Sequence, residues 1–268
     1  MTQPACRVLV VDDNAINREV AVELLRHIGV QADSAADGAE AVAMALSRAY
    51  DLIVMDVQMP GMDGIEATRR IRQARGTLPA IIALTANDQA DDRSACLAAG
   101  MDDYLTKPVR AAQLQRALQR WAPGPPAVTV SPRLTQAPAA ADDGAPQRRQ
   151  RLAAIAGLDV NGSLQNLGGQ MPRLERVLLR FATVYRAGDP ALLPAASQGD
   201  AAALWRACHS LRGACALLCA TALVQRIEAV EALLGAQQPS STWQEPVQRL
   251  QSELIALADQ LVAALAPP

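Results

Sequence analysis

The sequence predicts an α/β domain built on a doubly wound, five-stranded parallel sheet, followed by an all-α domain that forms a four-helix bundle. Three observations carry this prediction. Short apolar runs alternate with helical patterns in the first part of the chain, a proline-rich stretch interrupts it, and only helical patterns follow. The length of 268 residues suits two domains, and 50% apolar with only 3% aromatic residues suits cores of Ala, Leu, Val and Ile.

The first part, residues 1–122, contains the strands. Its apolar runs are short and unalternating, which is typical of strands buried on both faces of a parallel sheet. They are VLVV (8–11), LIVM (52–55) and IIAL (81–84), and weaker strands are expected at 30–35 and 101–105. Apolar residues spaced three or four positions apart predict helices at 16–28, 38–49, 63–75, 88–99 and 110–121. Gly29 is a typical residue to close the first helix.

Residues 123–149 separate the two domains. This stretch has six prolines, no aromatic residue and no apolar period, so it reads as a linker. After it, residues 150–268 show helical patterns at 171–186, 200–218, 221–235 and 243–265, with a short helix expected near 150–156. Four helices with short connections pack best as an antiparallel bundle.

Composition excludes several functions. The net charge of −2 and the lack of a basic face argue against nucleic-acid binding. No apolar run is long enough for a membrane span, and the opening MTQPACR is unlike a signal peptide. Five cysteines without a C-x-x-C pair fit reduced thiols and a cytoplasmic location. The three at positions 208, 215 and 219 are interpreted as small buried hydrophobes rather than a metal or redox site.

Polar side chains follow the predicted strands. Asp12 and Asp13 follow the first strand, Asp56 the third, Thr85 the fourth, and Lys107 comes after the fifth. Because ligands bind at the carboxyl ends of the strands in an open parallel sheet, these groups are expected to meet at one edge. Clustered carboxylates repel one another, and Mg²⁺ with oxygen ligands relieves that repulsion. A carboxylate surrounded by a cation, an ammonium and a hydroxyl group can accept a phosphoryl group.

Each of these residues alone has an ordinary structural explanation. Asp-Asp-Asn before a helix is commonly an N-cap, and Asp56 before a glycine-rich stretch could be a turn former. Their convergence at the ends of the correct strands favours the chemical reading. Lys107 is also the only lysine among the 25 Lys and Arg residues, which suggests that this position requires a compact point charge.

Four motifs of this part resemble those of receiver domains from two-component phosphorelays, which have a flavodoxin-like fold. They are VLVVDDN, DLIVMDVQMPGMDG, ALTA and GMDDYLTKP, and the wording MDVQMPGMDGIEATRRIR resembles receivers attached to hybrid histidine kinases. The resemblance covers nearly all of residues 5–121.

The receiver resemblance implies a role for each site residue. Asp56 is the implied phosphoacceptor, and Asp13 and Asp56 with the Gln58 backbone carbonyl would hold Mg²⁺, assisted by Asp12. Thr85 and Lys107 would bind phosphoryl oxygens. Tyr104 would be an aromatic switch residue, and the Lys107–Pro108 peptide bond is expected to be cis.

The second domain offers a candidate histidine. At 100° per residue, the apolar stripe of its 200–218 helix comprises Leu204, Cys208, Leu211, Cys215 and Leu218. His209 lies roughly 140° from this stripe, near Arg212 and Gly213, and is therefore expected to be exposed. His27, the other histidine, is interpreted as a structural or surface residue.

The segment HSLRGACALLCA resembles the H-x-L-K-G segment of histidine phosphotransfer (HPt) domains, and the stretch GLDVNGSLQNLGGQMPRLERVLLRFATVY resembles their opening. The resemblance covers about residues 155–265 and implies that His209 carries a phosphoryl group. Arg212 stands where the family usually has lysine and would supply positive charge to phosphoryl oxygens. Gly213 would allow close docking of a receiver, and Cys219 stands where glycine is common.

The sequence therefore predicts a phosphorelay protein. A sensor histidine kinase would phosphorylate Asp56, and His209 would pass the phosphoryl group to a downstream response regulator. No ATP-binding motif is present in this sequence, so it is either a free-standing relay protein or the C-terminal part of a hybrid kinase. Two alternatives stay open: a regulatory binding module whose docking is switched by receiver phosphorylation, and a phosphatase sink that drains phosphoryl groups to water.

Overall fold

A computed structural model describes residues 6–85, 90–122 and 144–266. The chain divides into two compact units, Met1–Ala137 and Pro138–Pro268, which are described separately below. Most of the predicted linker lies outside the described residues. None of the helices within the described ranges is long and apolar enough to cross a membrane.

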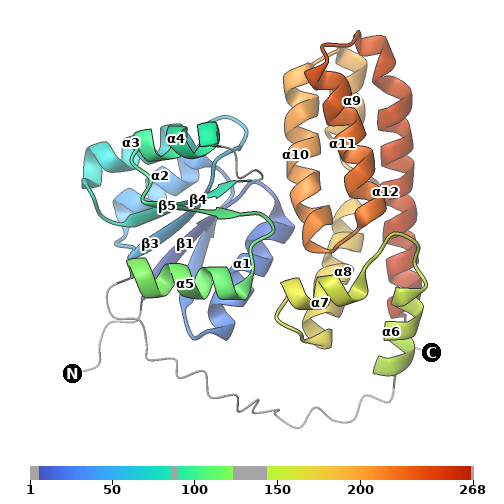
Figure 1. The fold of residues 1–268 in the computed structure, drawn as a ribbon, viewed down its shortest axis with the longest axis horizontal. Coiled ribbons are helices and arrows are strands. Elements are labelled where there is room, and N and C mark those ends of the chain that lie inside the picture. The colour runs from blue at the N-terminus through green and yellow to red at the C-terminus, as the bar shows by residue number, and fades with distance from the viewer. Residues whose placement is uncertain (1–5, 86–89, 123–143, 267–268) are drawn as a thin grey trace. The chain divides into compact units, whose positions relative to one another are not determined.

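The first unit is built on the predicted five-stranded sheet (Figure 1). Its strands are β1 (Arg7–Val11), β2 (Gln31–Ala35), β3 (Leu52–Asp56), β4 (Ala80–Thr85) and β5 (Asp103–Thr106). All neighbours pair in parallel in the order β2-β1-β3-β4-β5, so β1 and β3 lie side by side although a strand separates them in sequence. The chain order reverses at this pair, which makes its carboxyl edge the expected ligand site of the sheet.

Burial follows the strand order. β3 and β4 are buried throughout, and β1 is buried except at its first residue. The edge strand β5 is half-buried, and the edge strand β2 varies from exposed to buried along its length. The helices of this unit are α1 (Ala15–His27), α2 (Gly38–Ser47), α3 (Gly64–Arg75), α4 (Ala90–Ala98) and α5 (Ala111–Trp121). Figure 1 shows α1 and α5 on one face of the sheet and α2, α3 and α4 on the other. The central strands are apolar on both sides because both faces are covered.

Side-chain caps start the first three helices. The side-chain oxygens of Asn14, Asp37 and Asp63 accept hydrogen bonds from the first free backbone N–H groups of α1, α2 and α3. Such caps satisfy donors that have no partner inside the helix. At β1 the capping role therefore belongs to Asn14, which leaves the two preceding aspartates for other contacts.

The second unit contains the four predicted long helices, α8 (Met171–Tyr185), α10 (Ala201–Leu217), α11 (Thr221–Gly235) and α12 (Gln244–Leu265). They run side by side in Figure 1, with α12 packed against α8 and α11, and α10 packed against α11. The predicted stripe of α10 is completely buried. On α8, the Phe181 ring packs on Tyr185 with centroids 4.8 Å apart.

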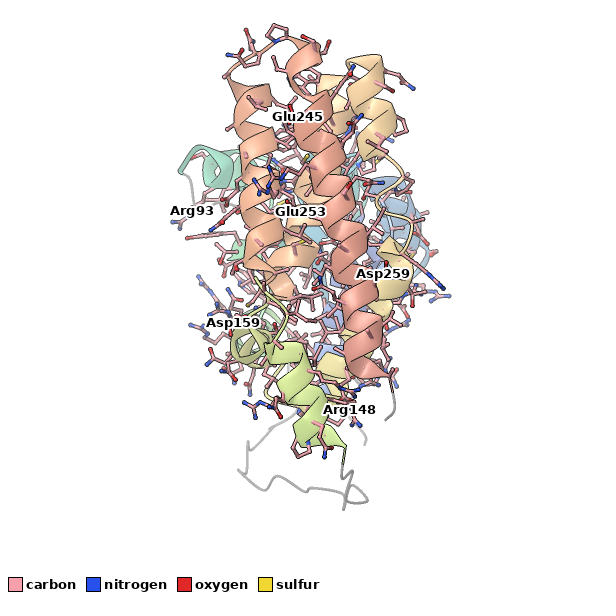
Figure 2. All side chains as sticks on the ribbon, turned by 90° about the vertical axis from the view of Figure 1, so that its right-hand side faces the viewer. Arg93, Arg148, Asp159, Glu245, Glu253 and Asp259 are labelled. Carbon is pink, nitrogen blue, oxygen red and sulfur yellow. The ribbon has the colours of Figure 1, made fainter. Side chains whose placement is uncertain are left out.

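Short helices depart from the prediction. α6 (Ala145–Ala153) overlaps the short helix expected near 150–156 but begins earlier, inside the stretch that was predicted to be linker. α7 (Val160–Asn166) and α9 (Leu192–Gln198) were not predicted. α7 and α9 have seven residues each, too few to show a helical period, and α9 also contains a proline. α6 is stabilised by tertiary contacts: Arg148, labelled in Figure 2, pairs with Glu175 of α8 at 2.8 Å.

The backbone at Cys219, just after α10, has a conformation that favours glycine. Its φ is +48°, in the left-handed region that a side chain disfavours. Local contacts hold it there, because the Cys219 carbonyl accepts a hydrogen bond from the Asp159 backbone N–H at 3.0 Å, and Asn166 donates to its sulfur at 3.4 Å. Asp159, also labelled in Figure 2, caps α7, so this turn ties the end of α10 to the start of the unit.

Gly64 lets α3 approach the end of β3. A Cβ atom at Gly64 would overlap the Asp56 backbone carbonyl oxygen, whereas a Cβ at Gly76, at the other end of α3, would meet nothing within 4 Å. We expect Gly64→Ala to lower the free energy of unfolding by about 1–3 kcal/mol and to shift the backbone amide resonances of Asp56 and Gln58.

Gly76→Ala is the matched control for this prediction. Because Gly76 has a φ of +70°, its replacement costs about 1–2 kcal/mol of stability through backbone strain alone. It should leave the amide resonances near Asp56 in place. Unmoved Asp56 resonances in Gly64→Ala would show that the close approach does not set the position of this residue.

Candidate functional site

Asp12 is fixed at the end of β1 by several donors. Its side-chain Oδ1 accepts hydrogen bonds from the Asn14 backbone N–H at 2.9 Å and from the Asn17 amide at 3.3 Å. The Asp12 carbonyl accepts from Arg18 at 2.6 Å. Only 1% of the residue is exposed, so its second carboxylate oxygen is aimed into the protein rather than into solvent.

Lys107 joins the strand ends. Its Nζ lies 2.9 Å from Asp12 Oδ2 and 2.6 Å from Asp56 Oδ2, and its side chain is 8% exposed. Asp56 is itself 1% exposed, and its Oδ1 accepts a hydrogen bond from the Gln58 backbone N–H at 3.2 Å. The Lys107–Pro108 peptide bond is cis, as the receiver resemblance implied. The structure thus brings together the carboxylates and the ammonium group that the sequence predicted.

The charged groups of this cluster shift one another's pKa values. Burial raises the pKa of the Asp56 carboxyl to about 7, the Lys107 ammonium opposes the rise, and the Asp12 charge adds to it. Burial alone would lower the pKa of Lys107, but the Asp12 and Asp56 carboxylates outweigh this effect and raise that pKa. Lys107 therefore stays charged at neutral pH and serves as the counter-charge of two buried aspartates.

Three carboxylates meet at this edge. Ligand atoms of Asp12, Asp13 and Asp56 all lie within 4.8 Å of one another, the one such group found among the described residues. Gln58, two residues after Asp56, has a buried side-chain oxygen, Oε1, with no hydrogen-bond partner in the described part of the chain. Hard divalent cations prefer oxygen donors of this kind, so the residues present fit Mg²⁺.

The remaining predicted receiver residues lie nearby. Thr85 ends β4, next to β3, and is 7% exposed. Its carbonyl accepts a hydrogen bond from the Lys107 backbone N–H at 2.8 Å, which ties the lysine loop to β4. Tyr104 lies half-buried on β5, with the Arg93 guanidinium 4.8 Å above its ring. Sequence reasoning did not identify Arg93, because the contact joins α4 to β5 across the fold.

His209 corrects an expectation. It was predicted to be exposed, yet only 6% of its surface is accessible. The prediction assumed that α10 is packed along one apolar stripe only, whereas α10 packs against both α9 and α11. In addition, the Trp205 ring, one turn earlier, stacks on the imidazole with centroids 5.0 Å apart and planes 22° from parallel. His27, by contrast, is exposed on α1, in agreement with its predicted surface role.

Arg212 lies one turn after His209. Its Nη2 is 3.4 Å from His209 Nδ1, and its Nη1 is 3.2 Å from Glu231 Oε2 on α11. Gly213, the predicted docking residue, is half-buried beside it. Glu231 was missed by sequence reasoning, because one acidic residue on a neighbouring helix carries no local signal.

Four of the five cysteines fit the role of small buried hydrophobes, whereas Cys219, which was predicted to be buried, is only half-buried in the turn after α10. All five are free thiols, and those at positions 6, 96, 208 and 215 are buried. Burial raises the pKa of Cys208 to about 12, so its thiol stays protonated and unreactive at neutral pH.

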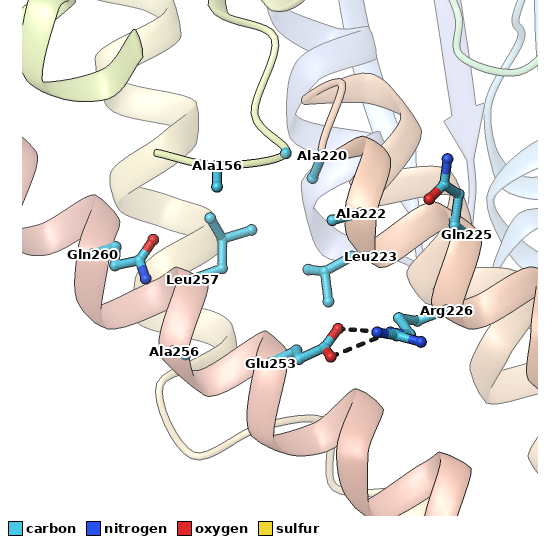
Figure 3. A pocket seen from close by; sticks show the side chains of 11 residues that line it. Ala156, Ala220, Ala222, Leu223, Gln225, Arg226, Glu253, Ala256, Leu257 and Gln260 are labelled. Carbon is cyan, nitrogen blue, oxygen red and sulfur yellow. Dashed lines mark hydrogen bonds and ion pairs between the residues drawn. The ribbon is translucent and has the colours of Figure 1, made fainter. Parts of the chain in front are cut away.

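A cavity of about 420 Å³ lies elsewhere in the second unit, between the start of α11 and the middle of α12 (Figure 3). Its charged side chains satisfy each other, since Arg226 Nε contacts both carboxylate oxygens of Glu253 at 3.2 and 3.1 Å. None of the predicted site residues lines it. The cavity therefore does not extend either candidate site.

Removing one charge from the cluster should stabilise the first unit. In the absence of metal, we expect Asp13→Asn to raise the unfolding temperature of this unit, because one repulsive carboxylate is lost. The corresponding gain in the free energy of unfolding is on the order of 1 kcal/mol. The same change should reduce the stabilisation produced by added Mg²⁺. Calorimetry with and without Mg²⁺ measures both effects.

The control for Asp13→Asn is Asp33→Asn in the same unit. The Tyr50 hydroxyl and the Arg48 guanidinium lower the pKa of Asp33, so its charged form stabilises the fold at neutral pH, and this stability is lost as the pH falls through the folded pKa. Asp33→Asn should therefore destabilise the unit. A loss of stability for both variants would contradict mutual repulsion at the acidic edge.

Comparison with known proteins agrees with this geometry. Residues 8–119 match the family model of the response regulator receiver domain, and residues 162–260 match that of the Hpt domain. Two-component system protein A of Emericella nidulans is 46% identical over 121 residues, and sensor protein GacS of Pseudomonas syringae pv. syringae is 42% identical over 126. These alignments cover 44% and 45% of this chain but only 18% and 14% of the two relatives.

A similar solved structure is the receiver domain of sensor histidine kinase PA1611 from Pseudomonas aeruginosa, which has a magnesium ion in its active-site cleft. It is 47% identical and covers 44% of this chain and 98% of its own, with a TM-score of 0.42. The two family matches lie in the same order as the two compact units. The chain therefore belongs to the two-component phosphorelay proteins, with a receiver domain at residues 8–119 followed by an Hpt domain at residues 162–260.

Proposed function

We propose that this chain relays phosphoryl groups from a sensor histidine kinase to a downstream response regulator, through Asp56 and then His209. The observation that carries the proposal is the buried Lys107 ammonium held between Asp12 and Asp56, 2.6 Å from the oxygen of the proposed acceptor. Such a counter-charge stabilises negative charge that builds up on a transferring phosphoryl group.

In the first step, an Asp56 carboxylate oxygen attacks the phosphorus of a phosphohistidine on the kinase. The new O–P bond forms as the N–P bond breaks, and the departing imidazole takes up a proton. Lys107 and Thr85 then bind the phosphoryl oxygens. Asp13, Asp56 and the Gln58 backbone carbonyl would hold Mg²⁺, assisted by Asp12, and the bound ion would neutralise charge on the same oxygens.

In the second step, an imidazole nitrogen of His209 attacks the phosphorus of the aspartyl phosphate. The new N–P bond forms as the O–P bond breaks, Asp56 leaves as a carboxylate, and the imidazole releases its proton to water. Arg212 lies close enough to the ring to supply positive charge for the incoming group. Because His209 is only 6% exposed, a receiver must reach it through a small opening, where half-buried Gly213 presents no side chain. The reverse chemistry delivers the phosphoryl group to the response regulator.

A cytoplasmic location is also proposed, and the five free thiols support it.

The order of transfer can be read from the two bond types. Acetyl phosphate should produce an alkali-labile acyl phosphate at Asp56 and an alkali-stable, acid-labile phosphohistidine at His209. We expect Asp56→Asn to lose both labels, because the asparagine amide is not a nucleophile, and His209→Gln to lose only the phosphohistidine. His27→Gln, a change at the exposed histidine of α1, should keep both.

Each contrary result has a defined meaning. An acyl phosphate on Asp56→Asn would show that the acceptor is another residue. An acyl phosphate without any phosphohistidine in the unmodified chain would favour the regulatory binding module, or the phosphatase sink if inorganic phosphate accumulates.

The point charge of Lys107 is tested by Lys107→Arg. This change keeps the positive charge, but the planar guanidinium is too large to contact both buried aspartates in the same space. We expect phosphoryl acceptance to slow by about tenfold or more and the phosphorylation-dependent spectral change to weaken. Arg48→Lys, an exposed change of the same chemical type, should have no effect. Unchanged kinetics in Lys107→Arg would mean that charge alone suffices.

A further inference from the structure

Arg212 is shared between His209 and a carboxylate of another helix. One guanidinium nitrogen faces His209 Nδ1 at 3.4 Å and the other pairs with Glu231 Oε2 at 3.2 Å. The Arg212 and Glu231 side chains are 23% and 13% exposed, so solvent screens this pair only in part. The proposed phosphoryl-binding cation thus already has an anionic partner.

Glu231 is poorly arranged for a purely stabilising role. Its second oxygen, Oε1, is buried and has no hydrogen-bond partner among the described residues. Burial raises the pKa of Glu231, against the pull of Arg212, and the nearby Glu228 adds to the rise. A buried carboxylate with one unsatisfied oxygen costs folding free energy, so fold stability does not explain its presence.

We propose that Glu231 is a positioning residue that limits how much phosphoryl group His209 retains. This inference rests on the proposed function of His209. A phosphoryl group on the imidazole brings about two negative charges and three acceptor oxygens within reach of Arg212. Glu231 competes with these oxygens for the guanidinium and repels their charge. The phosphohistidine is thereby kept less stable and passes more readily to an aspartate of a receiver.

The test uses the full chain with Asp56→Asn, so that no phosphoryl group drains to the internal aspartate. Phosphoramidate is the donor: an imidazole nitrogen of His209 attacks its phosphorus, the N–P bond of the donor breaks, and ammonia leaves with the imidazole proton. Phosphorus-31 NMR then measures the ratio of phosphohistidine to free histidine at equilibrium. His209→Gln in the same background identifies the signal.

We expect Glu231→Gln to raise this ratio on the order of tenfold, the size of effect that one nearby unit charge has on a doubly charged group in a partly solvated site. Glu231→Met, also neutral and similar in length, should give a rise of similar size if the glutamine variant folds poorly. Glu228→Gln removes an exposed charge from the same helix one turn earlier and should change the ratio less than twofold. The far-UV circular dichroism and thermal unfolding of each variant must match those of its parent, because a loosened fold would also expose the buried His209 to the donor and change the ratio.

The possible outcomes distinguish a failure of the proposed role of Glu231 from a failure of the proposed relay through His209. Phosphohistidine that forms at His209 but does not increase in either neutral variant overturns the role of Glu231 and leaves the relay intact. An equal rise in Glu228→Gln also overturns it, because a general field rather than the pair with Arg212 would then be responsible. If His209→Gln carries as much signal as its parent, the relay proposal itself fails.

Discussion

The proposed chemistry of the first domain depends on one interaction, the contact of the buried Lys107 ammonium group with Asp12 and Asp56. Without this charge, two carboxylates that are each 1% exposed would repel each other and favour protonation. With it, the Asp56 carboxylate, the proposed phosphoryl acceptor, lies 2.6 Å from a cation in a site with little solvent. Burial of two carboxylates lowers the stability of the fold, and the contacts with Lys107 offset part of this loss.

The fold supplies the geometry that this interaction needs. Pairing of β1 with β3 places the residues after both strands at one edge, and Thr85 at the end of β4 ties the Lys107 backbone to the same edge. Asn14 starts α1 and so leaves Asp12 for the site. Gly64 lets α3 begin directly behind Asp56. The site is therefore built from the ends of regular elements, which position side chains more precisely than free loops.

The second domain also places a proposed phosphoryl acceptor, here a histidine, beside a cation that is paired with a carboxylate. His209 is shielded by the Trp205 ring and faces Arg212, which is itself paired with Glu231. In both domains the proposed phosphoryl acceptor is almost buried and lies beside one cation that also contacts a carboxylate. In the proposed relay, a phosphoryl group at either site would compete with that carboxylate for the cation, which would favour onward transfer over long retention.

The sequence alone predicted the strands, the long helices and the gathering of polar residues at one edge of the sheet, because continuous apolar runs, helical spacing and strand order are local or repeat along the chain. It placed Asp12, Asp56 and Lys107 together without coordinates, since parallel strands bring their carboxyl ends to one edge. It failed where neighbours come from distant helices. Packing on two sides buried His209, and Glu231 reached Arg212 from α11, because these outcomes depend on which helices pack together and not on any pattern within one of them.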